Sequence, residues 1–347
     1  MMKWLWLVLL LTNVSCVMRA DEGDVEALKS RIVSAAAYSA KTGGMALLVK
    51  HDGKIIWESY ANGGGKNTPQ RIYSGTKAYW GLAALAAAED GLIDLDDRVA
   101  DTITEWKTDK TRSQIRVREL LDFTSGLPAL NALHENEYKD RTAAALKASC
   151  TGSPGKSFIY GPASLQVFHE LLKRKLEKKT PVRFLEREVL SSLGLGSQRY
   201  LPDSKGAPLL ASGFMQTARQ WSAMGRLILK NGESVLDEDD GLFSEAIKGS
   251  EANAAYAFGF WNNRAASSRS GREVDIESML DRPAGSQSWR GACLSKSAPP
   301  DLVACIGSYG QRVYAVPSRK LVIVRLGKGG TFRDAAFLKA VFGETKE

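Results

Sequence analysis

The hydrophobic pattern of the first ninety residues predicts a helix, a β-hairpin and a second helix. Apolar residues at helical spacing predict the first helix over residues 24–40. Two apolar runs, 45–49 and 55–57, flank the dipeptide Asp52-Gly53. Asp-Gly between two such runs indicates a tight hairpin turn, because both central residues of that turn need positive φ. The alanine-rich stretch within residues 75–90 predicts the second helix.

Helical patterns continue through the middle of the chain, and strand patterns return near its end. Loops with Pro and Gly separate helical stretches at residues 117–122, 143–148, 164–177, 182–190 and 218–229. Strand-like runs follow at 255–261, 302–305, 313–316 and 321–324, with a tight turn over 317–320. A closing amphipathic helix is predicted over 333–341.

Strands at both ends of the chain, with helices between them, predict a mixed α/β (α+β) fold. We expect a mostly antiparallel sheet built from both termini and flanked by helices, with an inserted all-helical domain. The sheet domain is placed at residues 24–78 plus 231–345, and the helical domain at 79–230. An active site is expected in the cleft between these two parts.

The first twenty residues have the organisation of a secretory signal peptide. A basic start at Lys3 precedes an apolar run over residues 4–11, which is too short to span a bilayer, and small polar residues follow. We therefore expect residues 1–20 to be a signal peptide and the protein to be exported, either periplasmic or secreted. The tripeptide Val14-Ser15-Cys16 resembles a lipoprotein processing box, although Asn13 stands where an aliphatic residue is usual. Membrane attachment through a lipidated Cys16 stays open as an alternative.

Composition and charge are those of an ordinary globular protein. Of 347 residues, 44% are hydrophobic and 25% are charged, and the formal net charge is +8. The densest basic run, residues 173–179, is interrupted by Leu176 and Glu177 and lies on a helical pattern, so it is best explained as a solvated helix face. We expect no nucleic-acid partner.

The four cysteines, Cys16, Cys150, Cys293 and Cys305, include no C-x-x-C pair. This spacing indicates neither a zinc site nor a disulfide framework, so no metal is expected. Buried free thiols are the simplest interpretation, and a bridge between Cys293 and Cys305 is the alternative in an oxidising compartment.

The chemistry-bearing motif is S-x-x-K at Ser74 and Lys77. Serine needs a partner that takes its proton before it can act as a nucleophile. On a helix, residues three apart lie on the same face within reach of each other. A serine at a helix start also has a free backbone N–H that can hold a developing negative charge. Burial would lower the pKa of the lysine and allow it to act as a base.

The spacing alone is weak evidence, because a second match occurs at Ser153 and Lys156. Pro154-Gly155 between them favours a turn, whereas Ser74 precedes a long apolar helix. The three histidines, at positions 51, 134 and 169, are each most simply surface residues. No G-x-S-x-G, H-E-x-x-H, Walker loop or G-x-G-x-x-G is present, so these motifs indicate no other enzyme class.

Several segments in order resemble class C β-lactamases and the related esterases and DD-peptidases of the penicillin-binding type. They are residues 73–78 and 89–99 around the nucleophile, 117–128 with Phe123 at the family's histidine, 154–162, and 212–219. The resemblance spans about residues 30–345. It implies a β-lactamase/transpeptidase-like fold and a catalytic role for Tyr160, whose phenolate would be stabilised by cations such as Lys77.

The chain departs from the family in two places. Pro162 replaces an asparagine that contacts substrate, and the third motif is best matched by Cys305-Ile306-Gly307, which lacks the family's Lys or His. That cation helps to hold a substrate carboxylate in the family, so esters, or amides without such a carboxylate, become the favoured substrates. The N–H of Ser308, next to Gly307, is the candidate second oxyanion donor.

The sequence therefore predicts a cofactor-independent serine hydrolase that acts on a small-molecule ester or amide, or on a cell-wall-derived substrate, through an acyl-enzyme. Ser74, Lys77 and Tyr160 are the predicted catalytic residues, and either Lys77 or Tyr160 is the base. The alternative is a non-catalytic, penicillin-binding-like protein of the cell envelope, which Pro162 and the missing cation favour.

Overall fold

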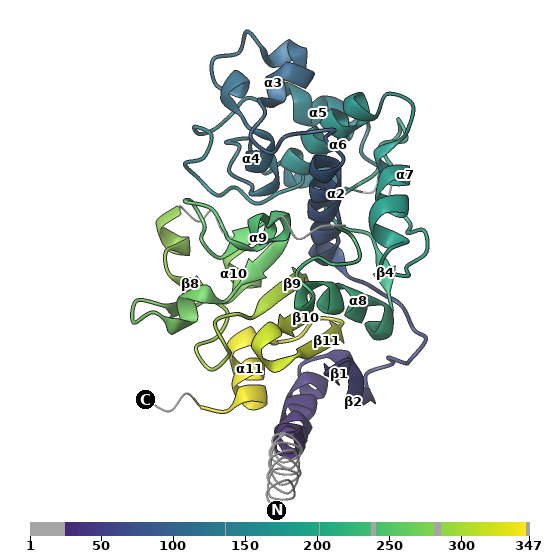
Figure 1. Cartoon of the computed structure of the whole chain (residues 1–347), viewed down its shortest axis with the longest axis vertical. Coiled ribbons are helices and arrows are strands. Elements are labelled where there is room, and N and C mark those ends of the chain that lie inside the picture. Colours follow the sequence, from purple (N-terminus) through teal and green to yellow (C-terminus); the bar gives the residue numbers. More distant parts are fainter. Residues whose placement is uncertain (1–24, 136, 201, 237–240, 281–285, 345–347) are drawn as a thin grey trace, which may run out of the picture.

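The protein folds around a seven-stranded antiparallel sheet (Figure 1). The computed structural model describes residues 25–344, except 136, 201, 237–240 and 281–285. The strand order is β2-β1-β11-β10-β9-β6-β5. These strands are β1 (Gly44–His51), β2 (Lys54–Tyr60), β5 (Tyr256–Ala257), β6 (Phe260–Asn262), β9 (Val303–Gly307), β10 (Gln311–Val316) and β11 (Leu321–Gly327). Because β1 pairs with β11, the sheet is built from both ends of the chain, which confirms the predicted fold class.

Helices, joined by loops and short strands, lie between the first and last strands of the sheet. The labelled helices are α2 (Lys77–Glu89), α3 (Val99–Thr102), α4 (Val117–Leu121), α5 (Arg141–Lys147), α6 (Ala163–Leu176), α7 (Pro181–Leu185), α8 (Ala218–Leu229), α9 (Leu242–Ile247), α10 (Ile276–Leu280) and α11 (Asp334–Phe342). A further helix runs through residues 25–41. The 3₁₀ turns are Tyr73–Thr76, Thr104–Trp106, Arg112–Gln114, Asn131–His134, Arg264–Ser267, Ser286–Trp289 and Pro317–Arg319, and a π-helical turn, Glu186–Leu190, extends α7. Two small sheets pair β3 (Gln70–Arg71) with β4 (Met215–Gln216), and β7 (Arg272–Glu273) with β8 (Ala292–Cys293).

Helices cover both faces of the large sheet. The ring of Tyr314 on β10 stacks on Phe337 of α11, with centroids 5.9 Å apart. The next residue, Ala315, points to the opposite face and pairs with Val322 of β11. A Cβ placed on Gly225 of α8 would lie only 2.3 Å from Val322, so α8 packs closely on that opposite face. The prediction assigned residues up to 230, and therefore α8, to the helical domain. In the structure α8 packs on β1, β10 and β11 of the sheet.

The central helix α2 is buried on nearly all sides. Eleven of its thirteen residues are buried, including the alanines at 83, 84, 86 and 87. A helix surrounded by protein needs no amphipathic stripe, and small side chains let its neighbours approach closely. Figure 1 shows α2 running from the sheet into the helical part of the molecule. The first turn of this helix is thereby enclosed where the two parts meet.

The prediction of one continuous strand over residues 255–261 is wrong. The segment forms a hairpin of β5 and β6, turned by Phe258 and Gly259 with φ of +51° and +93°. Its tip presses on the first turns of α2: a Cβ on Gly259 would lie 2.4 Å from the Ala78 nitrogen, and one on Gly81 would lie 2.0 Å from the Phe258 carbonyl oxygen. Glycine is required at these contacts because backbone meets backbone.

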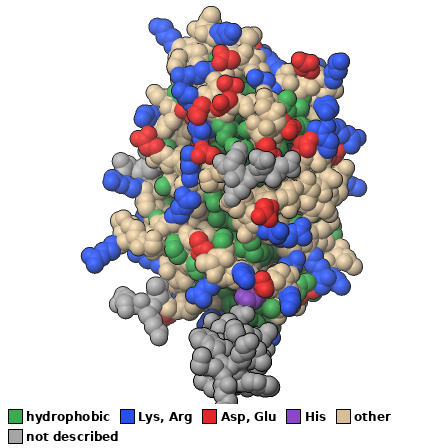
Figure 2. Space-filling model, in the orientation of Figure 1, with side chains coloured by type: hydrophobic (Ala, Val, Ile, Leu, Met, Phe, Trp, Pro, Cys, Tyr) green, Lys and Arg blue, Asp and Glu red, His purple; other side chains and the backbone are tan. Residues whose placement is uncertain are grey.

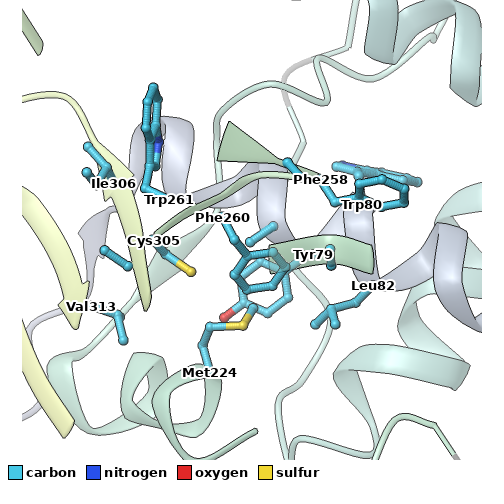
Figure 3. Close-up of a cluster of buried hydrophobic side chains, with 14 of the residues drawn as sticks. Tyr79, Trp80, Leu82, Met224, Phe258, Phe260, Trp261, Cys305, Ile306 and Val313 are labelled. Atoms are coloured by element: carbon cyan, nitrogen blue, oxygen red, sulfur yellow. The ribbon is translucent and has the colours of Figure 1, made fainter. Parts of the chain in front are cut away.

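Large side chains fill the junction between the hairpin, α2, α8 and β9 (Figure 3). Tyr79 of α2, Phe260 of β6, Met224 of α8 and Cys305 of β9 are all buried in this cluster. The buried Cys305 and Cys293 are free thiols, as expected, and Cys150 is a free, half-buried thiol. Packing at this junction holds the start of α2 rigidly against the sheet.

Two expectations concern the surface and the N-terminus. His169 was expected at the surface, but α6 turns it inward, where it is buried and its ring lies 6.0 Å from that of Trp80.

The predicted signal peptide and Cys16 lie outside the described residues. Among the helices that the structure describes, none is long and apolar enough to cross a membrane. On the face shown in Figure 2, Lys and Arg side chains are scattered, with acidic side chains between them.

Candidate active site

Ser74 lies in the 3₁₀ turn Tyr73–Thr76, which leads directly into α2. Tyr73 has φ of +45°, a left-handed conformation that is uncommon for a bulky side chain and recurs at functional sites. The turn packs tightly on the end of β9, because a Cβ on Gly307 would lie 2.0 Å from the Ile72 carbonyl oxygen. Ser74 is therefore held between the sheet and α2, and it stays partly exposed.

Lys77 follows Ser74 by one turn and has a buried side chain, with a relative exposure of 2%. Its Nζ donates to Ser74 Oγ at 2.8 Å and to the carbonyl oxygen of Ala211 at 3.0 Å. Burial lowers the pKa of Lys77 from 10.5 to about 7. A large fraction of this amine is therefore neutral near pH 7, where it can accept the Ser74 proton.

Tyr160 faces both residues from the segment before α6. The Lys77 Nζ lies 4.6 Å from the centre of the Tyr160 ring, over its face. Burial raises the pKa of Tyr160 above its ordinary value of 10, and the nearby Ser74 side chain only partly opposes this. The structure thus favours a neutral phenol at Tyr160 and does not support the expected stabilised phenolate.

Aromatic rings enclose Tyr160. The ring centroids of Phe123, Tyr256 and Phe158 lie 5.1, 5.8 and 6.0 Å from that of Tyr160. Phe123, at the position of the family's histidine, has φ of +56° and is buried. Burial raises the pKa of Tyr256 well above its ordinary value, so its phenol stays neutral, and the three rings act by excluding water and fixing the Tyr160 ring. Pro162 begins α6 without a side-chain cap, and a proline ring has no amide to offer a substrate.

The end of β9 lies beside the nucleophile. The rings of Tyr73 and Tyr309, the residues next to Ser74 and Ser308, have centroids 4.9 Å apart. Ser308 is exposed, and Gly307 packs against the strand that leads to Ser74. Cys305, which stands in place of the family's cation, is fully buried, with a relative exposure of 0%. The structure thus brings Ser74, Lys77, Tyr160 and the Gly307-Ser308 segment together, as the sequence predicted.

The second S-x-x-K match forms no comparable site. Ser153 is exposed and lies in a turn, and Lys156 is 67% exposed by its side chain and pairs with Glu251 at 3.5 Å. Neither burial nor a helix start is present at this position. The context of the motif, rather than its spacing, therefore separates Ser74 from Ser153.

Three groups near the site were missed from the sequence. The Ala211 carbonyl holds Lys77, but a backbone acceptor leaves no trace in residue types. His134 is exposed, as expected, but its nearness to the site was not predicted. Desolvation by nearby protein, and then the cations Lys77, Arg71 and Arg141, lower its pKa to about 4. The third group, Glu277, lies at the turn after Ser308. Within the described part of the chain, no three His, Cys, Asp or Glu side chains lie close enough together to hold a metal ion.

Comparisons with known proteins agree with the fold described above. The chain is similar to a structure of a beta-lactamase from Mycobacterium bovis, with a TM-score of 0.57 and 18% identity, covering 86% of this chain and 94% of that one. It is also similar to the structure of EstCE1, a hydrolase with promiscuous acyltransferase activity, with a TM-score of 0.62 and 17% identity, covering 92% of this chain and 100% of that one. At these identities the likeness concerns the fold.

A curated relative, Protein flp of Staphylococcus aureus (strain COL), is 26% identical over 134 residues. That match covers 36% of this chain and 27% of the relative, so the chain spans about a quarter of the relative's length. The model of the Beta-lactamase family matches residues 30–340, which is most of the chain and includes every residue of the site described above. The chain belongs to the beta-lactamase family of serine hydrolases.

Proposed function

We propose that this protein hydrolyses an ester or amide through an acyl-enzyme formed on Ser74. The observation that carries the proposal is the buried contact of 2.8 Å between Lys77 Nζ and Ser74 Oγ, together with a lysine pKa of about 7. A solvated lysine is protonated at neutral pH and cannot accept a proton. Burial of Lys77 removes that obstacle, and the 2.8 Å contact places the neutral amine within reach of the Ser74 proton.

The proposed reaction has two halves. Ser74 Oγ attacks the carbonyl carbon while its proton passes to the neutral amine of Lys77. The N–H groups of Ser74 and Ser308 stabilise the oxyanion of the tetrahedral intermediate. As that intermediate collapses, the bond to the leaving group breaks, and the leaving group takes the proton from Lys77 through the Tyr160 hydroxyl, which leaves the Lys77 amine neutral again. Water then attacks the acyl-enzyme while Lys77 takes a proton from the water. The bond between the acyl carbon and Ser74 Oγ breaks, and Ser74 Oγ takes that proton back from Lys77.

The proposed substrates are esters, or amides without a carboxylate beside the scissile bond. The support for this class is the buried, uncharged Cys305, which leaves no cation where relatives hold a substrate carboxylate. EstCE1, a hydrolase with acyltransferase activity, has a similar fold over 92% of this chain. β-Lactams and D-alanyl peptides carry such a carboxylate, so we expect them to be poor substrates.

We also propose export of the protein, on the sequence of residues 1–20 alone. The substrate would then be met outside the cytoplasm. N-terminal sequencing of the mature protein tests this proposal. A start near residue 21 supports secretion, a lipid-modified Cys16 supports attachment to a membrane, and an intact Met1 contradicts export.

Hydrolysis of p-nitrophenyl esters of graded acyl length, with nitrocefin and D-amino-acid amides beside them, tests the proposed reaction. The variant Ser74→Ala should lose at least about 10³-fold in kcat, the scale on which a catalytic nucleophile acts. The matched control Ser153→Ala changes the serine of the other S-x-x-K motif and should keep full activity. Stable labelling by a fluorophosphonate without turnover of any ester would favour the non-catalytic alternative.

A further inference from the structure

The turn between β9 and β10 is anchored by a carboxylate from α10. The backbone N–H groups of Tyr309 and Gly310 donate to Glu277 Oε2 and Oε1 at 2.9 and 3.0 Å. Both residues have positive φ, of +65° and +74°. Two successive N–H groups in such a turn converge on one point and form an anion-binding concavity. The Glu277 side chain occupies it.

A buried arginine fixes the other side of the same turn. Arg312 donates from Nη1 to the Gly307 carbonyl oxygen at 2.9 Å and from Nη2 to Glu277 Oε1 at 2.8 Å. Its side chain is 1% exposed and is held in turn by Asp334, which accepts from Nε at 2.6 Å and from Nη2 at 2.9 Å. The charge of Arg312 thus ties Glu277, the end of β9 and α11 into one rigid unit.

Ser308 lies between these anchored groups. Its preceding carbonyl, that of Gly307, is held by Arg312, and the two N–H groups that follow it are held by Glu277. For the N–H of Ser308 itself, no acceptor is found within the described part of the chain. An N–H that is left free while its neighbours are fixed is what oxyanion stabilisation requires, because the donor then needs no reorganisation during the reaction.

We propose that Glu277 is a positioning residue, which acts through the Tyr309 and Gly310 peptides to aim the Ser308 N–H at the oxyanion formed on the substrate of Ser74. This inference rests on the proposed function, since it assumes that Ser74 is acylated. Glu277 also holds Tyr309, whose ring packs on Tyr73 at 4.9 Å, so the same anchor braces the residue before the nucleophile.

The role needs a carboxylate rather than any polar group. The Glu277 carboxylate accepts from two backbone N–H groups and from Arg312, and both of its oxygens serve only as acceptors. A glutamine has one acceptor oxygen, and its NH₂ group would face a donor. The variant Glu277→Gln therefore keeps the size of the side chain but releases part of the turn.

The test compares Glu277→Gln with Asp275→Asn in the full-length protein. Asp275 lies just before α10, pairs with Arg333 at 2.7 Å and accepts from Ser278, but it does not contact the turn. The control thus disturbs the same segment and leaves the anchor of the turn intact. For each variant, kcat and KM for a p-nitrophenyl ester, the inhibition constant of phenylboronic acid, and Tm are measured.

For Glu277→Gln we expect kcat to fall by about 10- to 100-fold, less than the loss when a whole oxyanion donor is removed. KM should stay within about twofold, because the contact strengthens only in the transition state. Binding of phenylboronic acid, whose tetrahedral adduct places a hydroxyl at the oxyanion position, should weaken by a similar factor to kcat. The pH at which activity rises should stay near 7, since Lys77 is untouched. Asp275→Asn should keep kcat and boronate affinity within about twofold.

Two results would overturn the positioning role while the proposed function stands. One is an active wild-type enzyme whose kcat and boronate affinity are unchanged in Glu277→Gln. The other is an equal loss of kcat in both variants that follows their loss of Tm, because this would show a general effect on folding. If the wild-type protein neither hydrolyses an ester nor is labelled at Ser74, the proposed function fails and this inference fails with it.

Discussion

Replacing Lys77 with methionine should remove activity and stabilise the fold. Methionine has a similar length and no charge, so it fills the same space beside Ser74. In the native protein the Lys77 amine is buried and has a pKa of about 7 instead of 10.5. The unfolded chain exposes the amine to water, which favours its protonated form. Folding must therefore either remove the proton or bury the charge.

The size of this effect follows from the pKa. The difference between 10.5 and about 7 makes the native state less stable by on the order of 4 kcal/mol at pH 7. Methionine also removes the bonds to Ser74 Oγ and to the Ala211 carbonyl, which together contribute about 2–3 kcal/mol. The net expectation for Lys77→Met is a gain of about 1–2 kcal/mol at pH 7.

The dependence on pH is more diagnostic than the gain itself. Between pH 7 and pH 10.5 the unfolded chain holds the Lys77 proton and the folded chain does not. Since the unfolded state binds more protons in this window, wild-type stability rises with pH there. Lys77→Met lacks this titration, and every other group titrates alike in both proteins. The advantage of the variant should therefore shrink by about 3 kcal/mol between pH 7 and pH 9.5, and at the higher pH the wild type should be the more stable protein.

Urea denaturation of both proteins at pH 7, 8, 9 and 9.5, followed by circular dichroism, measures this difference directly. The m-value should be the same for both, so that the midpoints report stability. A gap between the two proteins that does not change with pH would refute the reasoning, because Lys77 would then have the same pKa in the folded and unfolded states. Lys77 would in that case be protonated at neutral pH and could not serve as the base.

Three further predictions concern the same site. The pH profile of kcat/KM should rise about tenfold per pH unit below pH 7 and level off above it, because the Lys77 amine must be neutral to accept a proton and its pKa is about 7. Tyr160→Phe should lower kcat by about 10²- to 10⁴-fold with KM within about threefold, since the ring is kept and only the proton path is lost; unchanged kcat would remove Tyr160 from the mechanism. Gly259→Ala should destabilise the fold by about 2–4 kcal/mol in urea denaturation, because its φ is +93° and its Cβ would lie 2.4 Å from the Ala78 nitrogen. The control Gly53→Ala, also at positive φ but with no atom within 4 Å of its Cβ, should cost only about 1 kcal/mol, and equal effects in both would contradict the role assigned to the hairpin contact.

Much of the fold could be predicted from local sequence patterns. The Asp52-Gly53 turn was predicted from its residue types, and both residues have positive φ in the structure. The alternating and β-branched runs near the end of the chain correspond to β9, β10 and β11. In contrast, the hairpin of β5 and β6 was missed because Phe258 gives no turn signal. Its left-handed conformation is imposed by contact with α2, which lies far away in the sequence.

For the candidate site too, local spacing could predict some of the residues and not others. Ser74 and Lys77 are close in the chain, so helical geometry could predict their contact, and the resemblance to a family supplied Tyr160. The Ala211 carbonyl and Glu277 contribute through long-range backbone contacts that no spacing encodes. His169 was placed at the surface because a polar residue on a helix is usually exposed, whereas α6 buries it against Trp80.

The central claim is that one buried, neutral lysine makes Ser74 a nucleophile. The most direct measurement is peptide mapping by mass spectrometry after brief reaction with a fluorophosphonate at pH 6 and pH 8. We predict a single modified serine, Ser74, labelled severalfold faster at pH 8, with Ser153 unmodified and no labelling in Lys77→Met. Labelling at another serine, or equally fast labelling of Ser74 in Lys77→Met, would contradict the account.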